Sequence, residues 1–333
     1  MEDKSRKKVS VVMCTYNGEK YLKEQLDSIL NQTYPIYEII IQDDASTDGT
    51  WEIIQEYSTK YQIIKSFKNN TSLSFNVNFY DALLKTTGDY IAFSDQDDIW
   101  LPQKIEVLIN IIGEKLLALG QDIVLFDDNK IVSATKIKYK TLEQFFIRSS
   151  YPGHAMLFCK SLLEIARNVM WIELAHDNLF SLIAIYYNSL TITDEVLQIW
   201  RRHGNNTTSF YIDKPIEIIN IDPQPRKQNK LTFVIKSLLK GEKSLAIAKG
   251  FNKYYELFSY LDNYSKSLHP NSKKIVKFTK FMKEQTFWGY IKASFLCFRL
   301  RKEMFDFKHY HLKTYYSVFT YVYRFWYDHR FDM

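Results

Sequence analysis

Residues 90–102 read Tyr-Ile-Ala-Phe-Ser-Asp-Gln-Asp-Asp-Ile-Trp-Leu-Pro, and this stretch decides the class of fold. Tyr90–Ser94 has the aromatic and β-branched content of a buried strand and ends abruptly in carboxylates. Pro102 suits the first turn of a following helix, because its missing N–H costs nothing there. Since open α/β sheets bind ligands at the carboxyl ends of their strands, we expect Asp95 and Asp97 to face a hard divalent cation on a diphosphate. The alternative is an acidic surface loop or a helix cap.

The composition is that of a chain that folds in a reducing compartment. It has 333 residues, 46% of them hydrophobic, and a formal charge of +6, which leaves room for one large domain and a smaller second one. Cys14, Cys159 and Cys297 are far apart, lack metal-ligand spacing and need not pair, which favours a reducing compartment. No secretory signal is visible, and no segment approaches the ~20 apolar residues of a membrane span. These features predict a cytoplasmic protein.

Strand-like and helix-like segments alternate through the first 126 residues. The predicted strands are Val9–Cys14, Glu38–Gln42, Ile63–Phe67, Tyr90–Ser94 and Asp122–Phe126. The predicted helices are Glu19–Gln32, a segment through Trp51, Ile54 and Tyr57, Phe75–Thr86 with Phe79, Leu83 and Leu84 inward, and a helix from Pro102 to about Leu119. This alternation predicts an α/β fold with a sheet that is parallel at its centre.

Two of the predicted strands end in acidic residues, Asp43 and Asp44 after the second and Asp95 and Asp97 after the fourth. Carboxylates at one sheet edge suit a nucleotide, because they accept hydrogen bonds from a base and from ribose hydroxyls. The chain has neither a Gly-x-Gly-x-x-Gly motif after the first strand nor a phosphate-binding Gly-x-x-x-x-Gly-Lys loop. A metal ion is then the economical way to neutralise the phosphates.

Taken together, five segments resemble a family-2 glycosyltransferase of GT-A fold. They are Val9–Val12, Thr15–Asn17, Gln32–Tyr34, Asp43–Thr50 and Ser94–Trp100. Their order and spacing match the family as far as Trp100, and a weaker match runs on to about residue 209. The last segment resembles especially the bacterial rhamnosyltransferase-like branch. The resemblance implies a GT-A sheet with flanking helices and Mn²⁺ or Mg²⁺ as cofactor. It also implies inverting transfer of a sugar from a nucleotide-diphosphate donor to an acceptor hydroxyl.

The resemblance also implies roles for individual residues on the donor side. Nucleotide contacts fall on Cys14, Thr15, Tyr16, Asn17, Asp43, Asp44, Asp95 and Gln96. Within this set, Cys14 and Asp44 match base contacts, and Asp95 matches the ribose contact. Asp97 matches the metal ligand. For Asp43 a turn or cap residue is the alternative.

On the acceptor side the resemblance points to Trp100, Gly153, His154 and His176. A packed or loop-capping role is the alternative for His154. An inverting transfer needs a carboxylate to take the proton from the attacking hydroxyl, and Asp177 matches that base. A plain N-cap for the helix from Leu179 to Tyr186 is the alternative for Asp177, and Glu173 is then the next candidate base.

A predicted strand, Ile192–Trp200, leads into a basic segment that resembles the family's lid over the pyrophosphate. His203 is predicted to be a second metal ligand, and Arg201 and Arg202 are predicted to neutralise the diphosphate. Such a lid would also exclude water, which would otherwise hydrolyse the donor. The alternative is a solvated basic loop.

The predicted domains are a GT-A glycosyltransferase catalytic domain over residues 1–210, a linker over 211–226, and a smaller helical domain, aromatic and basic, over 227–333. Helices are expected at Leu231–Leu239, Leu245–Asp262, Ser272–Glu284 and from Thr286 onwards. Their apolar and basic residues suit either a helical bundle or homodimer contact, or a membrane surface on the inner face of the membrane. Because no recognition motif is present, nucleic acid is not an expected partner.

The sequence thus favours a glycosyltransferase with a dTDP-rhamnose or UDP-hexose donor. The expected acceptor is a glycan, a lipid-linked glycan or a glycoprotein. A catalytically silent sugar-nucleotide or glycan-binding partner of an active transferase is the alternative from another class. The survival of both Asp97 and Asp177 favours the enzyme.

Overall fold

A computed structural model describes residues 6–73, 75–126, 131–133, 136–138, 151–172, 174–203, 245–264, 272–284, 292 and 295–296. The chain divides into two compact units. Unit 1 comprises Met1–Tyr139 and Ser150–Thr207, and unit 2 comprises Lys140–Ser149 and Thr208–Met333. The proposed boundaries at residues 210 and 226 lie outside the described residues and stay a prediction.

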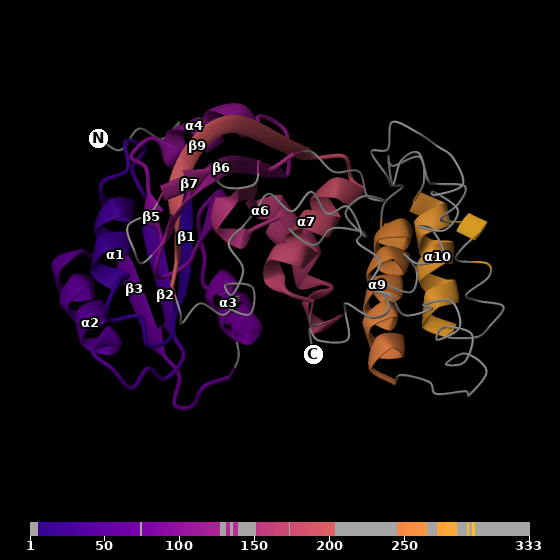
Figure 1. The fold of residues 1–333 in the computed structure, drawn as a ribbon, viewed down its shortest axis with the longest axis horizontal. Helices are drawn as coiled ribbons and strands as arrows, with labels where there is room; N and C mark the ends of the chain where they lie inside the picture. The colour runs from indigo at the N-terminus through magenta and orange to yellow at the C-terminus, as the bar shows by residue number, and fades with distance from the viewer. Residues whose placement is uncertain are drawn as a thin grey trace. The chain divides into compact units, whose positions relative to one another are not determined.

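Unit 1 is built on a curled mixed sheet with the order β3-β2-β1-β4-β8-β6-β9-β5 in the described part, with β7 paired to β6 (Figure 1). The strands are β1 Val9–Thr15, β2 Glu38–Asp43, β3 Ile64–Lys68, β4 Tyr90–Ser94, β5 Ile99–Trp100, β6 Leu117–Phe126, β7 Ile131–Ser133, β8 Met156–Cys159 and β9 Leu190–Arg202. From β3 to β4 the strands are parallel, whereas β8 runs antiparallel to both β4 and β6. The prediction of an α/β fold with a parallel centre is therefore confirmed.

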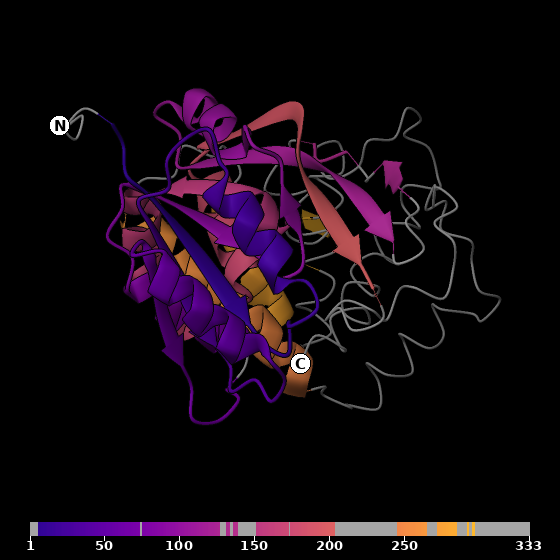
Figure 2. The same ribbon diagram turned by 90° about the vertical axis from the view of Figure 1, so that its left-hand side faces the viewer.

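Helices cover this sheet, as two views at right angles show (Figures 1 and 2). In unit 1 they are α1 Leu22–Leu30, α2 Thr50–Lys60, α3 Phe75–Leu84, α4 Lys104–Ile112, α6 Lys160–Arg167 and α7 His176–Tyr186, with the short turns η1 Gly153–Ala155 and η2 Met170–Ile172. Successive side chains of a strand point to opposite faces, so the central strands carry a separate apolar layer on each side.

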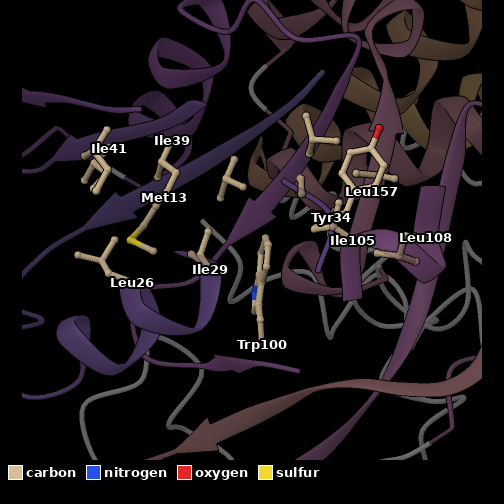
Figure 3. Close-up of a cluster of buried hydrophobic side chains, with 14 of the residues drawn as sticks. Met13, Leu26, Ile29, Tyr34, Ile39, Ile41, Trp100, Ile105, Leu108 and Leu157 are labelled. Carbon is tan, nitrogen blue, oxygen red and sulfur yellow. The ribbon is translucent and has the colours of Figure 1, made fainter. Parts of the chain in front are cut away.

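The first apolar layer joins the sheet to α1, α2 and α4 (Figure 3). Val11 and Met13 of β1 pack here with Leu26 and Ile29 of α1 and with Trp100 of β5, all of them buried. The second layer is aromatic and is contributed by β4, β8, α3 and α7. In it, the ring of Phe93 lies 5.4 Å from those of Phe79 and Phe180 and 5.0 Å from that of Phe158.

The predicted helix from Pro102 to about Leu119 is wrong in its second half. The helix α4 ends at Ile112 because Gly113 adopts a φ of 48°, a left-handed conformation that glycine reaches without strain. Leu117–Leu119 belong instead to β6, where they pair with β8. Leu84, predicted to point inward, is 52% exposed.

In unit 2 the structure describes two helices. They are α9, Leu245–Tyr264, and α10, Ser272–Glu284, which pack on each other. The predicted bounds of α10 are confirmed, and α9 runs two residues beyond the predicted Asp262. The segment Leu231–Leu239 and most of the chain after Thr286 lie outside the described residues. Among the helices that are described, none combines the length and the apolar character that crossing a membrane requires.

Glu38, the first residue of β2, is a buried carboxylate that links three parts of the sheet. It is 1% exposed and accepts hydrogen bonds from Ser10 Oγ at 2.7 Å, Thr87 N at 2.6 Å and Lys65 Nζ at 2.6 Å. Removing the carboxylate leaves buried hydrogen-bond donors without an acceptor. We therefore expect Glu38→Ala to lower the free energy of unfolding by about 3 kcal/mol. Urea unfolding measures it. Glu56→Ala, which removes an exposed ion pair with Lys23, is the control and should cost under about 1 kcal/mol.

The same carboxylate predicts a pH dependence. Burial raises the pKa of Glu38, but the hydrogen bonds from Lys65, Ser10 and Thr87 outweigh it and hold the pKa below its ordinary value. Its contribution to stability is therefore fully present above the unfolded pKa of about 4.3 and is lost as the pH falls through the lower folded pKa. The stability difference between wild type and Glu38→Ala should shrink over that acidic range. A difference that stays constant down to that range would contradict this role.

Candidate active site

The donor-side loops at the ends of β1 and β4 are fixed to each other. The Gln96 amide accepts a hydrogen bond from Tyr16 N at 2.9 Å and donates one to Tyr16 O at 3.0 Å. Its side chain also lies where a Cβ on Gly18 would stand, 2.3 Å from Oε1. These contacts give Gln96 a role in holding the two loops together. The nucleotide contact predicted for Gln96 stays a prediction.

The two acidic residues at the end of β2 have different surroundings. Asp43, the last residue of β2, is fully buried and accepts hydrogen bonds from Thr15 Oγ1 and Ser46 Oγ, and the nucleotide contact predicted for it stays a prediction. Asp44 is 6% exposed and accepts hydrogen bonds from Leu73 N and from Asn69 Nδ2. Burial raises the pKa of Asp44, but these hydrogen bonds more than offset it and keep the carboxylate ionised.

Cys14, Thr15 and Asn17 lie at the end of β1, beside the residues that follow β2. Asn17 adopts a φ of 48°, and its side-chain oxygen accepts a hydrogen bond from Thr47 N at 2.9 Å. Burial, with Asp95 and Asp44 nearby, raises the pKa of the Cys14 thiol well above its ordinary value, so the thiol stays neutral. Tyr16 is 51% exposed. The base contacts predicted for these residues stay predictions.

Asp97 and His203 meet although 106 residues separate them, with His203 Nε2 2.8 Å from Asp97 Oδ2. The end of β9 is held there because Arg201 N donates to Asp98 Oδ1 at 3.1 Å and Arg201 Nε donates to the Asp97 carbonyl at 3.0 Å. Burial and the nearby Asp95 raise the pKa of Asp97, in spite of the His203 imidazole. The structure therefore brings together the two residues that the sequence predicts as metal ligands.

Tyr21, which precedes α1, contacts both functional residues at the end of β9. Its ring centroid lies 4.6 Å from that of His203 and 4.7 Å from the Arg201 guanidinium carbon. Arg201 also pairs with Glu24 of α1, and Arg202 stacks over Trp200 at 4.6 Å. Sequence reasoning missed Tyr21, because in the sequence it looks like any other residue on the apolar face of a helix. The predicted diphosphate contacts of Arg201 and Arg202 remain predictions.

Tyr21→Ala is expected to release His203 from its place beside Asp97. Since one stacking contact of about 0.5–1.5 kcal/mol is lost, Mn²⁺ affinity in the presence of nucleotide should fall about three- to tenfold. Tyr21→Phe keeps the ring and should keep the affinity. Isothermal titration calorimetry measures both variants, and equal affinity for Tyr21→Ala and wild type would contradict this role.

Asp177 lies in the first turn of α7 but does not cap it. The N-cap is Ala175, and the Asp177 carboxylate accepts a hydrogen bond from Asn178 N at 2.7 Å. A Cβ on Gly153 would lie 3.5 Å from Asp177 Cβ and 3.1 Å from His176 Nε2, so η1 presses against this turn. The half-buried Asp177 thus stands beside the segment predicted to contact the acceptor. Glu173 lies outside the described residues.

Two residues predicted on the acceptor side are packed in the core instead. Trp100 is 2% exposed and belongs to the first apolar layer. The His176 imidazole is stacked 3.9 Å from the ring of Phe79, and burial lowers its pKa. The structure gives both side chains a packing role, and the acceptor contacts predicted for them stay predictions. A strand-end tryptophan and a helix-start histidine look alike in sequence whether they face a ligand or the core.

His154 lies among three carboxylates, and we call His154, Asp95, Asp98 and Asp122 the inner cluster. His154 Nδ1 is 3.1 Å from Asp95 Oδ2 and 3.3 Å from Asp98 Oδ2, and Nε2 is 3.2 Å from Asp122 Oδ2. Burial lowers the pKa of His154, but Asp98 and the two hydrogen-bonded carboxylates outweigh it and raise the pKa to about 10. The imidazole is therefore buried and favours its protonated form, and the acceptor contact predicted for it stays a prediction.

The inner cluster also sets the charge of its acidic members. Burial raises the pKa of Asp95, but the hydrogen bond from His154 and its charge lower it overall. Burial raises the pKa of Asp98 to about 7. Sequence reasoning did not assign Asp98 or Asp122. Asp98 could have been found as the third carboxylate of the Asp-Gln-Asp-Asp motif. Asp122 comes close to His154 only in the folded chain.

Two groups of side chains have the donor atoms of a cation site. Asp95, Asp98 and His154 offer ligand atoms that all lie within 4.8 Å of one another. In this group the His154 ring already contacts both carboxylates through the same nitrogen, Nδ1, at 3.1 and 3.3 Å. The second group is Asp97 and His203, which do not belong to the inner cluster. They offer a carboxylate oxygen and an imidazole nitrogen, a donor set that fits Mn²⁺ or Mg²⁺. The residues of the predicted metal site therefore fit the group.

Comparisons with known proteins agree on the class. The profile of glycosyl transferase family 2 matches residues 10–164. The dTDP-rhamnosyl transferase RfbG of Shigella flexneri is 30% identical over 210 residues, 58% of this chain and 72% of that protein. EpsE of Bacillus subtilis is 38% identical over 124 residues, 36% of this chain and 45% of EpsE. The chain belongs to glycosyltransferase family 2.

The fold is shared with a solved member of this class. TarS of S. aureus, residues 1–349, solved in complex with UDP-GlcNAc, superposes with a TM-score of 0.52 at 18% identity, over 90% of this chain and 93% of that one. The GT-A-like architecture predicted from the sequence is thereby confirmed.

Proposed function

We propose that this chain is an inverting, metal-dependent glycosyltransferase that uses a nucleotide-diphosphate sugar. The observation that carries the proposal is the meeting of Asp97 and His203 at 2.8 Å, at the carboxyl end of β4. The family membership supports sugar transfer, and the carboxylate–imidazole pair supports a divalent cation at the diphosphate. A bound cation would neutralise the departing diphosphate there.

The described side chains can divide the work of the reaction. Asp44 and Cys14 would meet the base, and Asp95, held by the imidazolium of His154, would accept a hydrogen bond from ribose. Asp177 would take the proton from the acceptor hydroxyl while the oxygen of that hydroxyl bonds to the anomeric carbon. The bond from that carbon to the diphosphate breaks on the opposite side, so the configuration inverts.

The resemblance to the rhamnosyltransferase-like branch and the similarity to RfbG favour dTDP-rhamnose as donor. A UDP-hexose is the second candidate. The acceptor proposed is a hydroxyl of a glycan, a lipid-linked glycan or a glycoprotein. The competing function is a silent binding partner of an active transferase. The placement of Asp177 against Gly153, beside the donor side, favours the enzyme.

The helical unit supports a contact with an anionic membrane surface. The apolar residues Ile275 and Phe278 of α10 are buried, whereas its lysines Lys273, Lys274, Lys277 and Lys280 are exposed. Exposed lysines near anionic lipid contribute about 1 kcal/mol each, enough for a reversible association. A homodimer through this unit is the alternative, and vesicle flotation with and without anionic lipid distinguishes the two.

Thermal stabilisation by nucleotides tests the donor site. UDP, dTDP and GDP are each added with Mn²⁺, with Mg²⁺ or with EDTA, and the melting temperature is measured. We expect one or two of the nucleotides to raise it, and the rise to depend on the divalent cation. Equal melting temperatures under all conditions would contradict the proposed function.

A further inference from the structure

Lys104, the first residue of α4, is a buried cation to which the proposed reaction gives no role. Its side chain is 1% exposed, and lysines are almost never this buried unless they are paired. Its Nζ donates to the carbonyl of His154 at 2.6 Å and to Gln198 Oε1. It also lies 3.8 Å from the ring centroid of Trp100. Both hydrogen-bond acceptors are neutral, so the groups that favour the charged form of Lys104 lie elsewhere.

Those groups belong to the inner cluster. Asp98, Asp95 and Asp122 all act on the Lys104 ammonium and favour its charged form, although burial lowers its pKa to about 7. The inner cluster itself has three acidic side chains against a single imidazolium. The protonated form of Lys104 adds positive charge beside this cluster, at the carbonyl of His154.

The hydrogen bonds of Lys104 also join three separate segments. It lies on α4, and its two acceptors belong to η1 and to β9, with Gln198 94 residues along the chain. The carbonyl it holds is that of His154, whose ring lies between Asp95 and Asp122. Lys104 thus holds the backbone from which the His154 imidazole projects.

Only one acidic member of the inner cluster has room to move. The Asp95 side chain is 45% exposed, whereas those of Asp98 and Asp122 are 0% and 5% exposed. Without the Lys104 charge, repulsion between Asp95 and its acidic neighbours would be relieved most easily if Asp95 turned towards solvent. Asp95 is also the member that the proposed function places against ribose.

We propose that Lys104 is a positioning residue for the donor site, which holds His154 and thereby keeps Asp95 in the orientation that meets the nucleotide. The inference rests on the proposed function in so far as Asp95 contacts ribose. It assigns no contact between Lys104 and the donor. Lys104 acts entirely through His154 and the charge of the inner cluster.

A double-mutant cycle on the full chain tests this positioning role. Affinity for UDP and for dTDP is measured by calorimetry at one fixed, saturating Mn²⁺ concentration in wild type, Lys104→Met, Asp95→Asn and the double variant. Loss of a hydrogen-bonded charge predicts about tenfold weaker binding for Lys104→Met. In the Asp95→Asn background the repulsion is already relieved, so Lys104→Met should weaken binding less than about twofold. A structural role alone would give the same loss in both backgrounds, and that result would overturn the inference.

Ile105→Val, at the next residue of α4, is the matched control for damage to the helix. It should lower the melting temperature and leave nucleotide affinity unchanged. If Lys104→Met does not fold, Gln198→Met replaces it in the cycle, since it removes one of the two acceptors of the ammonium. It should give a smaller loss that again disappears in the Asp95→Asn background, and a loss that persists there would overturn the inference.

A crystal structure of Lys104→Met without nucleotide separates this inference from the proposed function. Asp95 Oδ2 should leave His154 Nδ1, from which it is 3.1 Å away in the native chain. An Asp95–His154 contact that stays unchanged would overturn the positioning role whatever the protein binds. A wild type that binds neither UDP nor dTDP, together with a displaced Asp95 in the variant, would count against the proposed function alone.

Discussion

Replacing Asp177 by asparagine is expected to lower the rate of sugar transfer by about 10²–10⁴-fold, the usual contribution of a positioned general base. The amide cannot take the proton from the acceptor hydroxyl, but it keeps the size of the side chain. Donor and metal affinity should hardly change, because neither depends on this proton transfer. Steady-state kinetics with saturating donor and acceptor measure the effect.

The fold should tolerate the Asp177→Asn change. Ala175, not Asp177, is the N-cap of α7, and an asparagine oxygen still accepts the hydrogen bond from Asn178 N. Glu52→Gln, which alters an acidic residue in the first turn of α2, is the matched control and should leave both rate and melting temperature unchanged. Transfer at the wild-type rate by Asp177→Asn would remove Asp177 from the reaction and make Glu173 the next candidate.

Asp97→Ala is expected to abolish the metal dependence of donor binding and to lower turnover by about 10²–10³-fold, because the diphosphate loses several kcal/mol of charge stabilisation. Unlike Asp177→Asn, it should weaken donor affinity as well as the rate. EDTA should reduce wild-type activity to the level of this variant, and excess Mn²⁺ should not restore the variant. The measurements are donor affinity by calorimetry and release of nucleoside diphosphate.

The matched control for Asp97→Ala is Asp81→Ala, which removes an exposed carboxylate from α3 and should change neither quantity. Full metal-dependent activity in Asp97→Ala would contradict the assignment. The pair Asp95 and Asp98 with His154 would then be the site to test for the cation.

Much of the sheet follows from local pattern. The strand Tyr90–Ser94 has the predicted bounds, because a short apolar run between turn signals leaves little freedom. The end of α4 was missed, because the apolar residues 117–119 continue the helical pattern after Gly113. Periodicity alone does not distinguish a buried strand from a buried helix of that length.

Only part of the candidate site could be predicted from the sequence. Asp97 and His203 were paired by resemblance, and the fold brings them to 2.8 Å. Lys104 and Asp122 went unassigned because a lysine after a proline and an aspartate in a strand both look solvent-exposed in sequence. Trp100 was assigned to the acceptor but is buried. Chemistry that arises where distant segments converge leaves no local pattern, and the sequence alone does not reveal it.

Release of nucleoside diphosphate from a panel of nucleotide sugars tests the central claim most directly. Phosphorus-31 NMR would follow dTDP-rhamnose and UDP-hexoses incubated with the protein and Mn²⁺, with acceptor glycans or water as the receiving hydroxyl. The account predicts that one donor class yields its nucleoside diphosphate, and that EDTA or Asp97→Ala stops the release. Metal-dependent binding of a donor without any release, for every donor and acceptor tried, would contradict an active transferase and favour the silent binding partner.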